Sequence, residues 1–296
     1  MKKSFNYFRA NPAGNITGFV VWPVYPGYRK AYTDCIREQI DETVEQVGFI
    51  SPAYEGAPLR MDMMGGEFCA NATRAYGLYS ASFYDVEGPV DIEVYVSGKE
   101  GVTDVVADVK KQTAYVAMEE PESIEDVELE GGNYKLVHLP GISHVIIDDR
   151  EEDEDFAIRA IKAIKAGHET DAYGVVFYNK DKSEIIPYVY VPKTETLVRE
   201  SSCGSGTAAL VNTINPDINN LDEDYKIVVK QPGGELEVLV YDLEDGRKYM
   251  IGGPVELGEV EKISIDIPQE IVQKVTKEHD EDVERRRAAG EDVSGI

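Results

Sequence analysis

The chain has 296 residues, of which 30 are basic and 56 acidic, and its formal net charge is −26 at pH 7. A charge of this sign argues against nucleic acid and anionic membranes as partners. No stretch is apolar for long enough to span a membrane, and the N-terminus lacks the continuous apolar region of a secretory signal. Three cysteines with no close pair indicate a reducing compartment, so we expect a cytoplasmic protein.

The first hundred residues predict alternating strands and helices. A strand over residues 15–21 follows a turn at 11–14. A helix follows, because apolar residues recur at helical spacing at Tyr32, Cys35, Ile36, Ile40, Val44 and Val47. A strand at 48–50, a helix that starts at Cys69 and a strand at 92–98 complete this series.

The same series returns about 130 residues later, which indicates an internal duplication. A strand at 145–147, a helix through Phe156, Ala160, Ile161 and Ile164, and a strand at 174–176 repeat the first three elements. Cys203 and the segment 227–233 repeat the last two. We therefore predict a mixed α/β (α+β) fold with two pseudo-symmetric domains, over residues 1–125 and 126–260. The acidic, turn-rich stretch 119–132 marks the predicted boundary.

Residues 261–296 form a charged C-terminal extension that has no repeat in the chain. We expect part of 260–275 to join the first domain, with Ile271, Val272 and Val275 docking one helical turn. Beyond Lys277 nearly every residue is charged, which predicts a solvated helix that fades into disorder.

Two segments carry the same pattern around a cysteine, and they lie at 65–75 and 200–209. In each, a glutamate precedes the cysteine, and small or polar residues then lead into a helix. A cysteine at a helix start faces unpaired amides and the positive end of the helix dipole, so we expect thiolate to be favoured. A single buried cysteine is usually a packing residue, and we assign Cys35 to packing. Two in matching contexts favour reactive thiols facing one cleft between the domains.

Two thiols on opposite sides of one carbon suit racemisation. One removes a proton as thiolate, and the other delivers a proton to the opposite face. Free amides at the two helix starts would stabilise the enolate-like carboxylate that develops. The sequence has no phosphate-binding loop, no hydrolase elbow and no zinc-ligand spacing, and no lysine stands out as a pyridoxal-phosphate anchor. We therefore expect an enzyme with no cofactor and no metal.

At this point three motifs resemble the diaminopimelate epimerase superfamily of cofactor-independent amino-acid racemases. They are Glu-Phe-Cys-Ala-Asn-Ala at 67–72, Cys-Gly-Ser-Gly-Thr at 203–207 and Gln-Pro-Gly-Gly at 231–234. The segment Glu-Gln-Val-Gly-Phe-Ile at 45–50 resembles the histidine racemases of staphylopine-type metallophore biosynthesis. The resemblance implies two domains, each a mostly antiparallel sheet or barrel wrapped round a central helix. It also implies a small amino-acid substrate and leaves a homodimer open.

Carried over residue by residue, the resemblance implies two groups of site residues. The catalytic group is Cys69 and Cys203 as the two bases, with Glu45 as an acidic group that orients a thiol or the substrate. The substrate-binding group is Asn15, Ala70, Asn71, Ala72, His144, Gly204, Ser205 and Gly206. Asn15 is equally consistent with a simple turn residue. Glu67 and Glu200 are interpreted as favouring the helix dipole, without a catalytic role.

Departures from the superfamily pattern bear on the substrate. The Glu-Arg-Gly that grips the distal end of diaminopimelate is absent, and the corresponding region reads Val-Pro-Lys-Thr-Glu at 191–195. A distal zwitterion needs a charged partner, so diaminopimelate is a poor candidate and histidine is the favoured substrate. Two alternatives remain open: a diaminopimelate epimerase or racemase of another amino acid, and a non-catalytic amino-acid-binding module.

Overall fold

The computed structural model describes residues 1–52, 59–215, 217–220, 222, 226–244 and 246–291. Its helices are α1 Pro26–Gln39, α2 Ala70–Ala81, α3 Glu154–Gly167, α4 Gly204–Ile214 and α5 Gln269–Ala288, with a short 3₁₀ turn at Ile218–Asn220. Its first strands are β1 Lys2–Asn11, β2 Thr17–Val21, β3 Gln46–Pro52, β4 Leu59–Met63, β5 Val90–Val96, β6 Val102–Asp108, β7 Thr113–Ala117, β8 Ser123–Leu129 and β9 Gly132–Leu139. The later strands are β10 Ile142–Ile147, β11 Ala172–Asn179, β12 Glu184–Val191, β13 Thr196–Arg199, β14 Ile227–Gln231, β15 Gly234–Leu243, β16 Gly246–Pro254, β17 Glu256–Leu257 and β18 Glu261–Asp266.

The order of elements is the repeated one that the sequence predicts. Each half begins with a strand, a helix and a second strand parallel to the first, namely β2–α1–β3 and β10–α3–β11. Each half then continues through a cysteine-led helix, α2 or α4, into antiparallel strands. The helix between parallel strands supplies the long connection that such a pair requires.

Helices α2 and α4 are the central helices of the fold. Small side chains such as Ala72, Ala75, Ala208 and Ala209 let strands pack close to them, and nearly every residue of both helices is buried. Both helices belong to one hydrophobic core, whereas α3 packs over a second core and α1 over a third. A helix that is apolar all round is the kind that a fold encloses.

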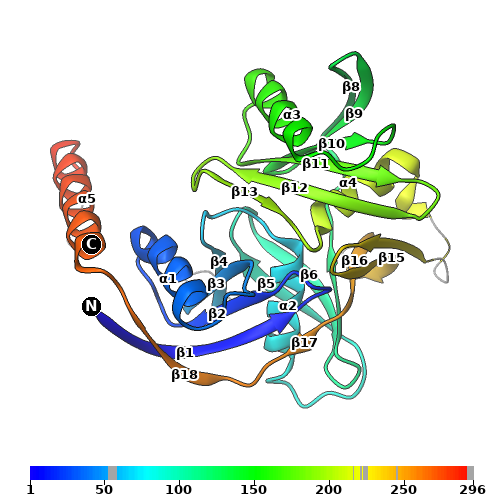
Figure 1. The fold of residues 1–296 in the computed structure, drawn as a ribbon. Helices are drawn as coiled ribbons and strands as arrows, with labels where there is room; N and C mark the ends of the chain where they lie inside the picture. The colour runs from blue at the N-terminus through cyan, green and yellow to red at the C-terminus, as the bar shows by residue number, and fades with distance from the viewer. Residues whose placement is uncertain (53–58, 216, 221, 223–225, 245, 292–296) are drawn as a thin grey trace.

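Figure 1 shows two neighbouring lobes, with α1, α2 and β1–β6 in blue and cyan below and α3, α4 and β8–β13 in green and yellow above. Pairing between β-strands also connects the two lobes. β16 pairs with β7, with Met250 opposite Ala117 and Gly252 opposite Tyr115. β17 and β18 return to β1, where Ala10 lies opposite Leu257. Strands that follow residue 125 in the chain therefore complete the first lobe. For this reason, the division of the chain at residue 125 remains a proposal about its duplication.

The first predicted helix is shorter in the structure than the apolar spacing indicates. α1 ends at Gln39, and the Asp41 carboxylate accepts hydrogen bonds from the Thr43 amide at 2.9 Å and from the Thr43 hydroxyl at 2.5 Å. This local turn competes with helix propagation. Val44 and Val47 are buried in the α1 core from the following turn and β3, so the expectation that they are helical is wrong.

The acidic boundary stretch is also more ordered than predicted. β8 and β9 form an antiparallel hairpin with Leu129 opposite Gly132, and the two turn residues have φ of 49° at Glu130 and 83° at Gly131. Positive φ at both positions is the signature of a tight hairpin turn. Most side chains of β8 are exposed, and charge on an outer strand prevents pairing with other chains.

Within the C-terminal extension, β18 pairs with β1, and the helix α5 that follows stands apart from the lobes in Figure 1. Val275 is buried, and Ile271 and Val272 pack against the α1 core. The one-turn docking predicted from the sequence is therefore confirmed. Residues 292–296, for which disorder was expected, lie outside the described residues.

Candidate active site

Cys69 and Cys203 occupy equivalent positions at the starts of the two central helices. Each is the N-cap residue of its helix, with φ and ψ of −130° and 110° at Cys69 and −134° and 112° at Cys203. Each sulfur accepts a hydrogen bond from an amide three residues on, at 3.4 Å from Ala72 or Gly206. The two thiols thus take the place of the usual serine or aspartate cap. Cys35 is buried on α1, away from both helix starts.

The two helix starts meet across the lobes. A Cβ added to Gly204 would lie 2.5 Å from the Cβ of Ala70. The Asn71 amide donates to the Ser202 carbonyl at 3.1 Å and to the Ser202 hydroxyl at 2.9 Å. The predicted convergence of the two cysteine turns is therefore present in the structure.

Arg74, one turn along α2, is fully buried beneath this junction. Its guanidinium donates to the Asn71 side-chain oxygen at 3.0 Å and to the carbonyl of Gly253 at 3.1 Å. Burial lowers the pKa of Arg74 to about 9. The side-chain nitrogen and oxygen of Asn71 are both hydrogen-bonded to protein groups. Only the backbone amide of Asn71 therefore remains to bind a ligand.

A network of amides surrounds Cys69. Gln46, at the start of β3, donates to the Cys69 sulfur at 3.1 Å and to the Asn15 side-chain oxygen at 2.6 Å. Asn15 in turn donates to a Glu45 carboxylate oxygen at 2.6 Å. Glu45 also accepts from the hydroxyl and the amide of Ser201, which lies just before the second cysteine. Glu45 therefore joins the first lobe to the second, and its contact with a thiol runs through Asn15 and Gln46.

Cys203 has a different set of neighbours. Its sulfur lies 3.4 Å from the Ser205 hydroxyl, which lies 2.9 Å from His144 Nε2. Its amide donates to Gln231 Oε1 at 2.6 Å. Burial lowers the pKa of His144 to about 3, so this imidazole is neutral. His144 is completely buried behind Ser205, which suits a residue that holds Ser205 in place.

Both thiols are harder to ionise than the sequence predicts. Burial, and to a lesser extent the Glu200 carboxylate, raise the pKa of Cys69 to about 12. Burial raises the pKa of Cys203 well above its usual range, and Glu200, which hydrogen bonds with this thiol, adds to the shift. The hydrogen bonds from the helix amides lower the pKa of both thiols, but burial has the larger effect. The expectation of thiolates favoured at rest is therefore wrong for this structure.

Glu200 also has a perturbed pKa. Burial raises the pKa of its carboxyl to about 7, partly offset by the hydrogen bond with Cys203. Burial likewise raises the pKa of Glu67, whose Oε2 atom is buried with no hydrogen-bond partner among the described residues. Perturbed carboxyl groups gathered beside reactive thiols are characteristic of functional sites.

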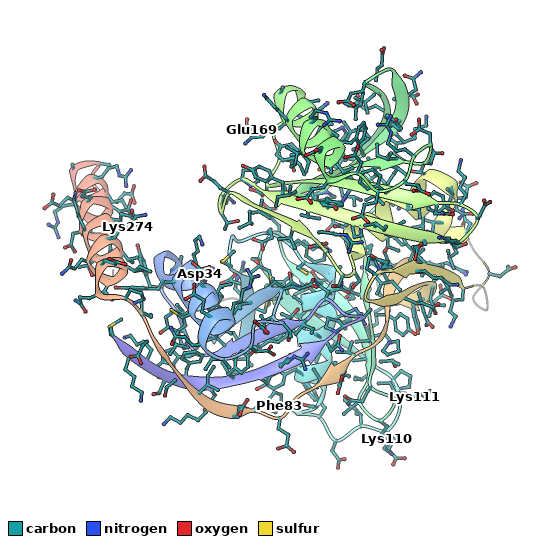
Figure 2. The ribbon with its side chains drawn as sticks, viewed as in Figure 1. Asp34, Phe83, Lys110, Lys111, Glu169 and Lys274 are labelled. Carbon is teal, nitrogen blue, oxygen red and sulfur yellow. The ribbon has the colours of Figure 1, made fainter. Side chains whose placement is uncertain are left out.

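A cavity of about 90 Å³ lies between the two lobes, and its lining includes Gln46 and Glu200, which contact Cys69 and Cys203. It is lined by the three carboxylates Glu45, Glu67 and Glu200, by Asn15 and Gln46, and by residues of α1, β12 and β13. Asp34 of α1, labelled in Figure 2, is among the lining residues. The lining carries more acidic than basic groups, which favours a positively charged ligand.

The structure assigns the predicted residues to different parts of this site. The amides of Ala72 and Gly206 donate to the two sulfurs, while Ala70, Gly204 and Ser205 lie in the first turns of α2 and α4. The sequence interpretation missed Gln46 and Ser201, and it gave Glu200 no role beyond favouring the helix dipole. Glu200 was identifiable by its position three residues before Cys203, although its burial depends on the other lobe.

The chain matches the family described as "Histidine racemase CntK N-terminal domain" over residues 4–259. A histidine racemase of Fusobacterium nucleatum is 33% identical over 85% of this chain and 94% of its own length. A histidine racemase of Staphylococcus aureus is 24% identical over 80% of this chain and 89% of its own.

Solved structures with low identity share the fold. A hydroxyproline epimerase from Agrobacterium vitis has a TM-score of 0.60 at 13% identity, covering 90% of this chain and 94% of its own. A predicted epimerase from Pseudomonas aeruginosa has a TM-score of 0.61 at 12% identity, covering 88% and 99%. The predicted two-domain epimerase fold is thereby confirmed. By its sequence, the chain belongs to the histidine racemase family.

Proposed function

We propose that the protein interconverts L- and D-histidine by a two-base mechanism in which Cys69 and Cys203 act on opposite faces of the α-carbon. One observation carries the reaction type: two cysteines cap two central helices that meet end to end. A proton is removed from one face and another is delivered to the opposite face, which inverts the centre. Neither step needs a cofactor, and we propose that none takes part.

The helix starts supply the electrostatic part of the mechanism. Loss of the α-proton spreads negative charge onto the substrate carboxylate. Amides at the starts of α2 and α4, including those of Ala70 and Gly204, are fixed in place before the charge develops. Preorganised donors of this kind stabilise the transition state without reorganisation.

The raised thiol pKa values mean that the reactive thiolate must be produced as the substrate binds. An α-ammonium group beside the thiols favours the charged form of the sulfur, opposing burial and the Glu200 carboxylate. Glu200 hydrogen bonds with Cys203 and has a pKa of about 7, so it is suited to exchange a proton with this thiol near neutral pH. We propose Glu200 as a third participant that the sequence interpretation left out.

The choice of histidine rests on the relatives and on the charge of the cavity. Family members that are 33% and 34% identical to this chain are named histidine racemases. The cavity between the lobes is lined by Glu45 and by Glu67, whose buried Oε2 atom has no hydrogen-bond partner among the described residues. An imidazole ring donates to a carboxylate through N–H, and the bond is stronger when either partner is charged. We propose that one of these carboxylates holds the substrate ring.

The remaining proposals concern the setting of the enzyme. Among the described residues, every helix is too short or too polar to cross a bilayer. We propose a cytoplasmic enzyme, from the cysteine content, and a homodimer, from the family resemblance. We further propose that it acts in metallophore biosynthesis, as the resemblance of residues 45–50 implies.

The direct experiment follows α-deuterium uptake and chiral inversion of L-histidine in D₂O. Cys69→Ser and Cys203→Ser should each lower racemisation by about 10²–10⁴-fold, because a serine hydroxyl is a far weaker base than a thiolate. Cys35→Ser is the matched control, since Cys35 is buried in the α1 core, and it should keep normal activity. Near-normal racemisation by either active-site variant would refute the two-thiol mechanism.

Parallel assays separate the alternatives for the substrate. L-histidine should exceed LL-diaminopimelate by at least about tenfold in kcat/KM, equivalent to about 1.4 kcal/mol. Preferential turnover of diaminopimelate would overturn the substrate and leave the mechanism standing. Binding of histidine with no deuterium uptake by the wild-type protein would instead identify a binding module.

A further inference from the structure

A second cluster of chemically active side chains lies in the upper lobe, away from the two thiols. Glu125 of β8, His138 of β9 and His168 at the C-terminal cap of α3 each offer one ligand atom, and these atoms all lie within 4.8 Å of one another. Two of the four histidines of the chain therefore meet here, from positions 30 residues apart. The proposed racemase mechanism uses none of these residues.

The distances match a tetrahedral metal site. Glu125 Oε1 lies 3.2 Å from His138 Nε2 and 3.2 Å from His168 Nε2. Zinc bonds to nitrogen and oxygen are about 2.0–2.1 Å long, so adjacent ligands of a tetrahedral zinc ion lie about 3.3 Å apart. The two edges that meet at Glu125 therefore have the length such an ion requires, and the third edge, between the two histidines, lies within 4.8 Å. A set of two histidines and one carboxylate also leaves a fourth position open.

The His138 ring is held in the orientation that coordination requires. Its Nδ1 atom lies 2.8 Å from the Ser143 hydroxyl on β10. Donation of the Nδ1 proton to this hydroxyl leaves the Nε2 lone pair facing Glu125 and His168. Ligating histidines commonly have such a partner on the second ring nitrogen. The rings of His138 and His168 also contact each other, with centroids 4.7 Å apart.

The surroundings favour a cation that can be reached from solvent. A cavity of about 370 Å³ adjoins His138 and is lined by Glu122, Glu169 and Asp171. Glu169, labelled in Figure 2 near α3, directly follows His168 in the chain. The three ligands are partly exposed, which gives a metal ion an entry path. Their side chains come from three elements, so a bound ion would link β8, β9 and the end of α3.

We infer that Glu125, His138 and His168 bind a divalent transition-metal ion, with Zn²⁺ the best match to the ligand set and geometry. This inference departs from the sequence-based expectation that the chain holds no metal. The expectation rested on short ligand spacings, whereas these three ligands are brought together by the hairpin and by the end of α3. The site is independent of the thiols and does not depend on which amino acid the enzyme racemises.

The test is calorimetric titration of metal-free full-length protein with Zn²⁺, in a background that carries Cys69→Ser and Cys203→Ser so that the two active-site thiols cannot contribute. We expect one Zn²⁺ per chain. His138→Gln and His168→Gln should each weaken binding at least tenfold, and Zn²⁺ should raise the Tm of the parent but not of these variants. His279→Gln is the matched control, because His279 is a partly buried histidine that packs on Tyr25 of the lower lobe.

Co²⁺ provides a second measurement on the protein with its thiols intact. Binding at the proposed site should give the visible spectrum of tetrahedral cobalt without the intense charge-transfer band of a thiolate ligand. Absence of binding would show that the three side chains form only a hydrogen-bonded cluster. Binding that survives both histidine variants, or that shows thiolate coordination alone, would likewise overturn the inference.

Discussion

At the scale of single residues, Glu200 combines a cost to stability with a proposed role in the reaction. Its pKa is raised from 4.5 to about 7, chiefly by burial. A carboxyl group with a raised pKa contributes stability that is present below its unfolded pKa and is lost as the pH rises through its folded pKa. The folded protein therefore loses stability between about pH 4.5 and 7 as Glu200 ionises. A buried charge beside two thiols lowers the stability of the fold, and its proposed role in the reaction explains why it is present.

We predict that Glu200→Gln stabilises the protein and impairs catalysis. The variant removes the cost of ionisation, so unfolding free energy at pH 8 should rise by about 1–3 kcal/mol, with little gain at pH 4.5. It also removes a charge that raises the pKa of Cys203, so the thiols should react with an alkylating reagent at lower pH than in the wild type. Racemase kcat/KM should fall at least tenfold.

Denaturant titrations at the two pH values, alkylation rates against pH and racemase assays test these effects together. Glu259→Gln changes an exposed carboxylate and is the control. Unchanged alkylation profiles would show that Glu200 does not act on the thiols. Unchanged activity would remove it from the mechanism.

The sequence predicted which cysteines matter but not how they ionise. Helix-capping positions follow from local patterns around Cys69 and Cys203. Ionisation depends on burial by the opposite lobe and on Glu200, which come from tertiary contacts. The contact between Gln46 and Cys69 could not be predicted for the same reason, since 23 residues separate the two.

At the scale of secondary-structure elements, the close approach of α2 and α4 is the feature that places the two thiols. Gly204 is the first residue of α4, and an added Cβ would meet Ala70 and no other residue at short range. The junction therefore has room for one methyl group, and this is the side chain of Ala70 on α2.

We predict that Gly204→Ala lowers activity and that Ala70→Gly restores it in the double variant. The single change places two Cβ atoms 2.5 Å apart, which separates the helix starts, whereas the double change leaves the Ala70 Cα at 3.8 Å. Because proton transfer depends steeply on geometry, kcat should fall by about 10²-fold in the single variant. A double-mutant cycle with kcat and Tm measures the coupling.

The Ala70→Gly variant alone is the control for lost helix propensity. Additive effects in the cycle would mean that the two residues do not contact each other.

The existence of these helices was predictable from local chemistry. The true end of α1 was not, because Val44 and Val47 keep an apolar spacing while they reach the core from a turn and a strand.

α5 gives a second prediction at this scale. Its first turns pack on α1, where Val275 lies close to Gly27 and the ring of His279 lies 4.9 Å from that of Tyr25. The later turns, beyond residue 280, are mostly exposed. We predict that removal of residues 281–296 leaves Tm and kcat unchanged, whereas removal of 269–296 lowers Tm by several degrees.

The reason is burial, since one fully buried valine contributes about 1.5–3 kcal/mol. Thermal unfolding and racemase assays on both truncations are the measurement. An equal loss of stability in the shorter truncation would show that the charged turns have a structural partner. Full stability of the longer truncation would show that Val275 adds nothing.

At the scale of the whole molecule, the duplication is visible in the sequence, but the pairing between halves is not. Repeated glycines, cysteines and apolar runs predict the elements of each half in order. Hydrophobic periodicity carries no information on which distant strand is a partner. The pairs β7–β16 and β1–β18 therefore had to come from the structure, as did the meeting of Glu125 with two histidines.

The pairing of β1 with β18 has a consequence for synthesis of the chain. β1 lies between β2 and β18, with Phe5 opposite Ile263 and Lys2 opposite Asp266. One edge of β1 therefore stays open on the ribosome until nearly the whole protein has been translated. Contacts between such distant segments slow folding, and an open strand edge invites association with other chains. The first lobe comes first in the sequence, but its sheet is completed only when β18 pairs with β1.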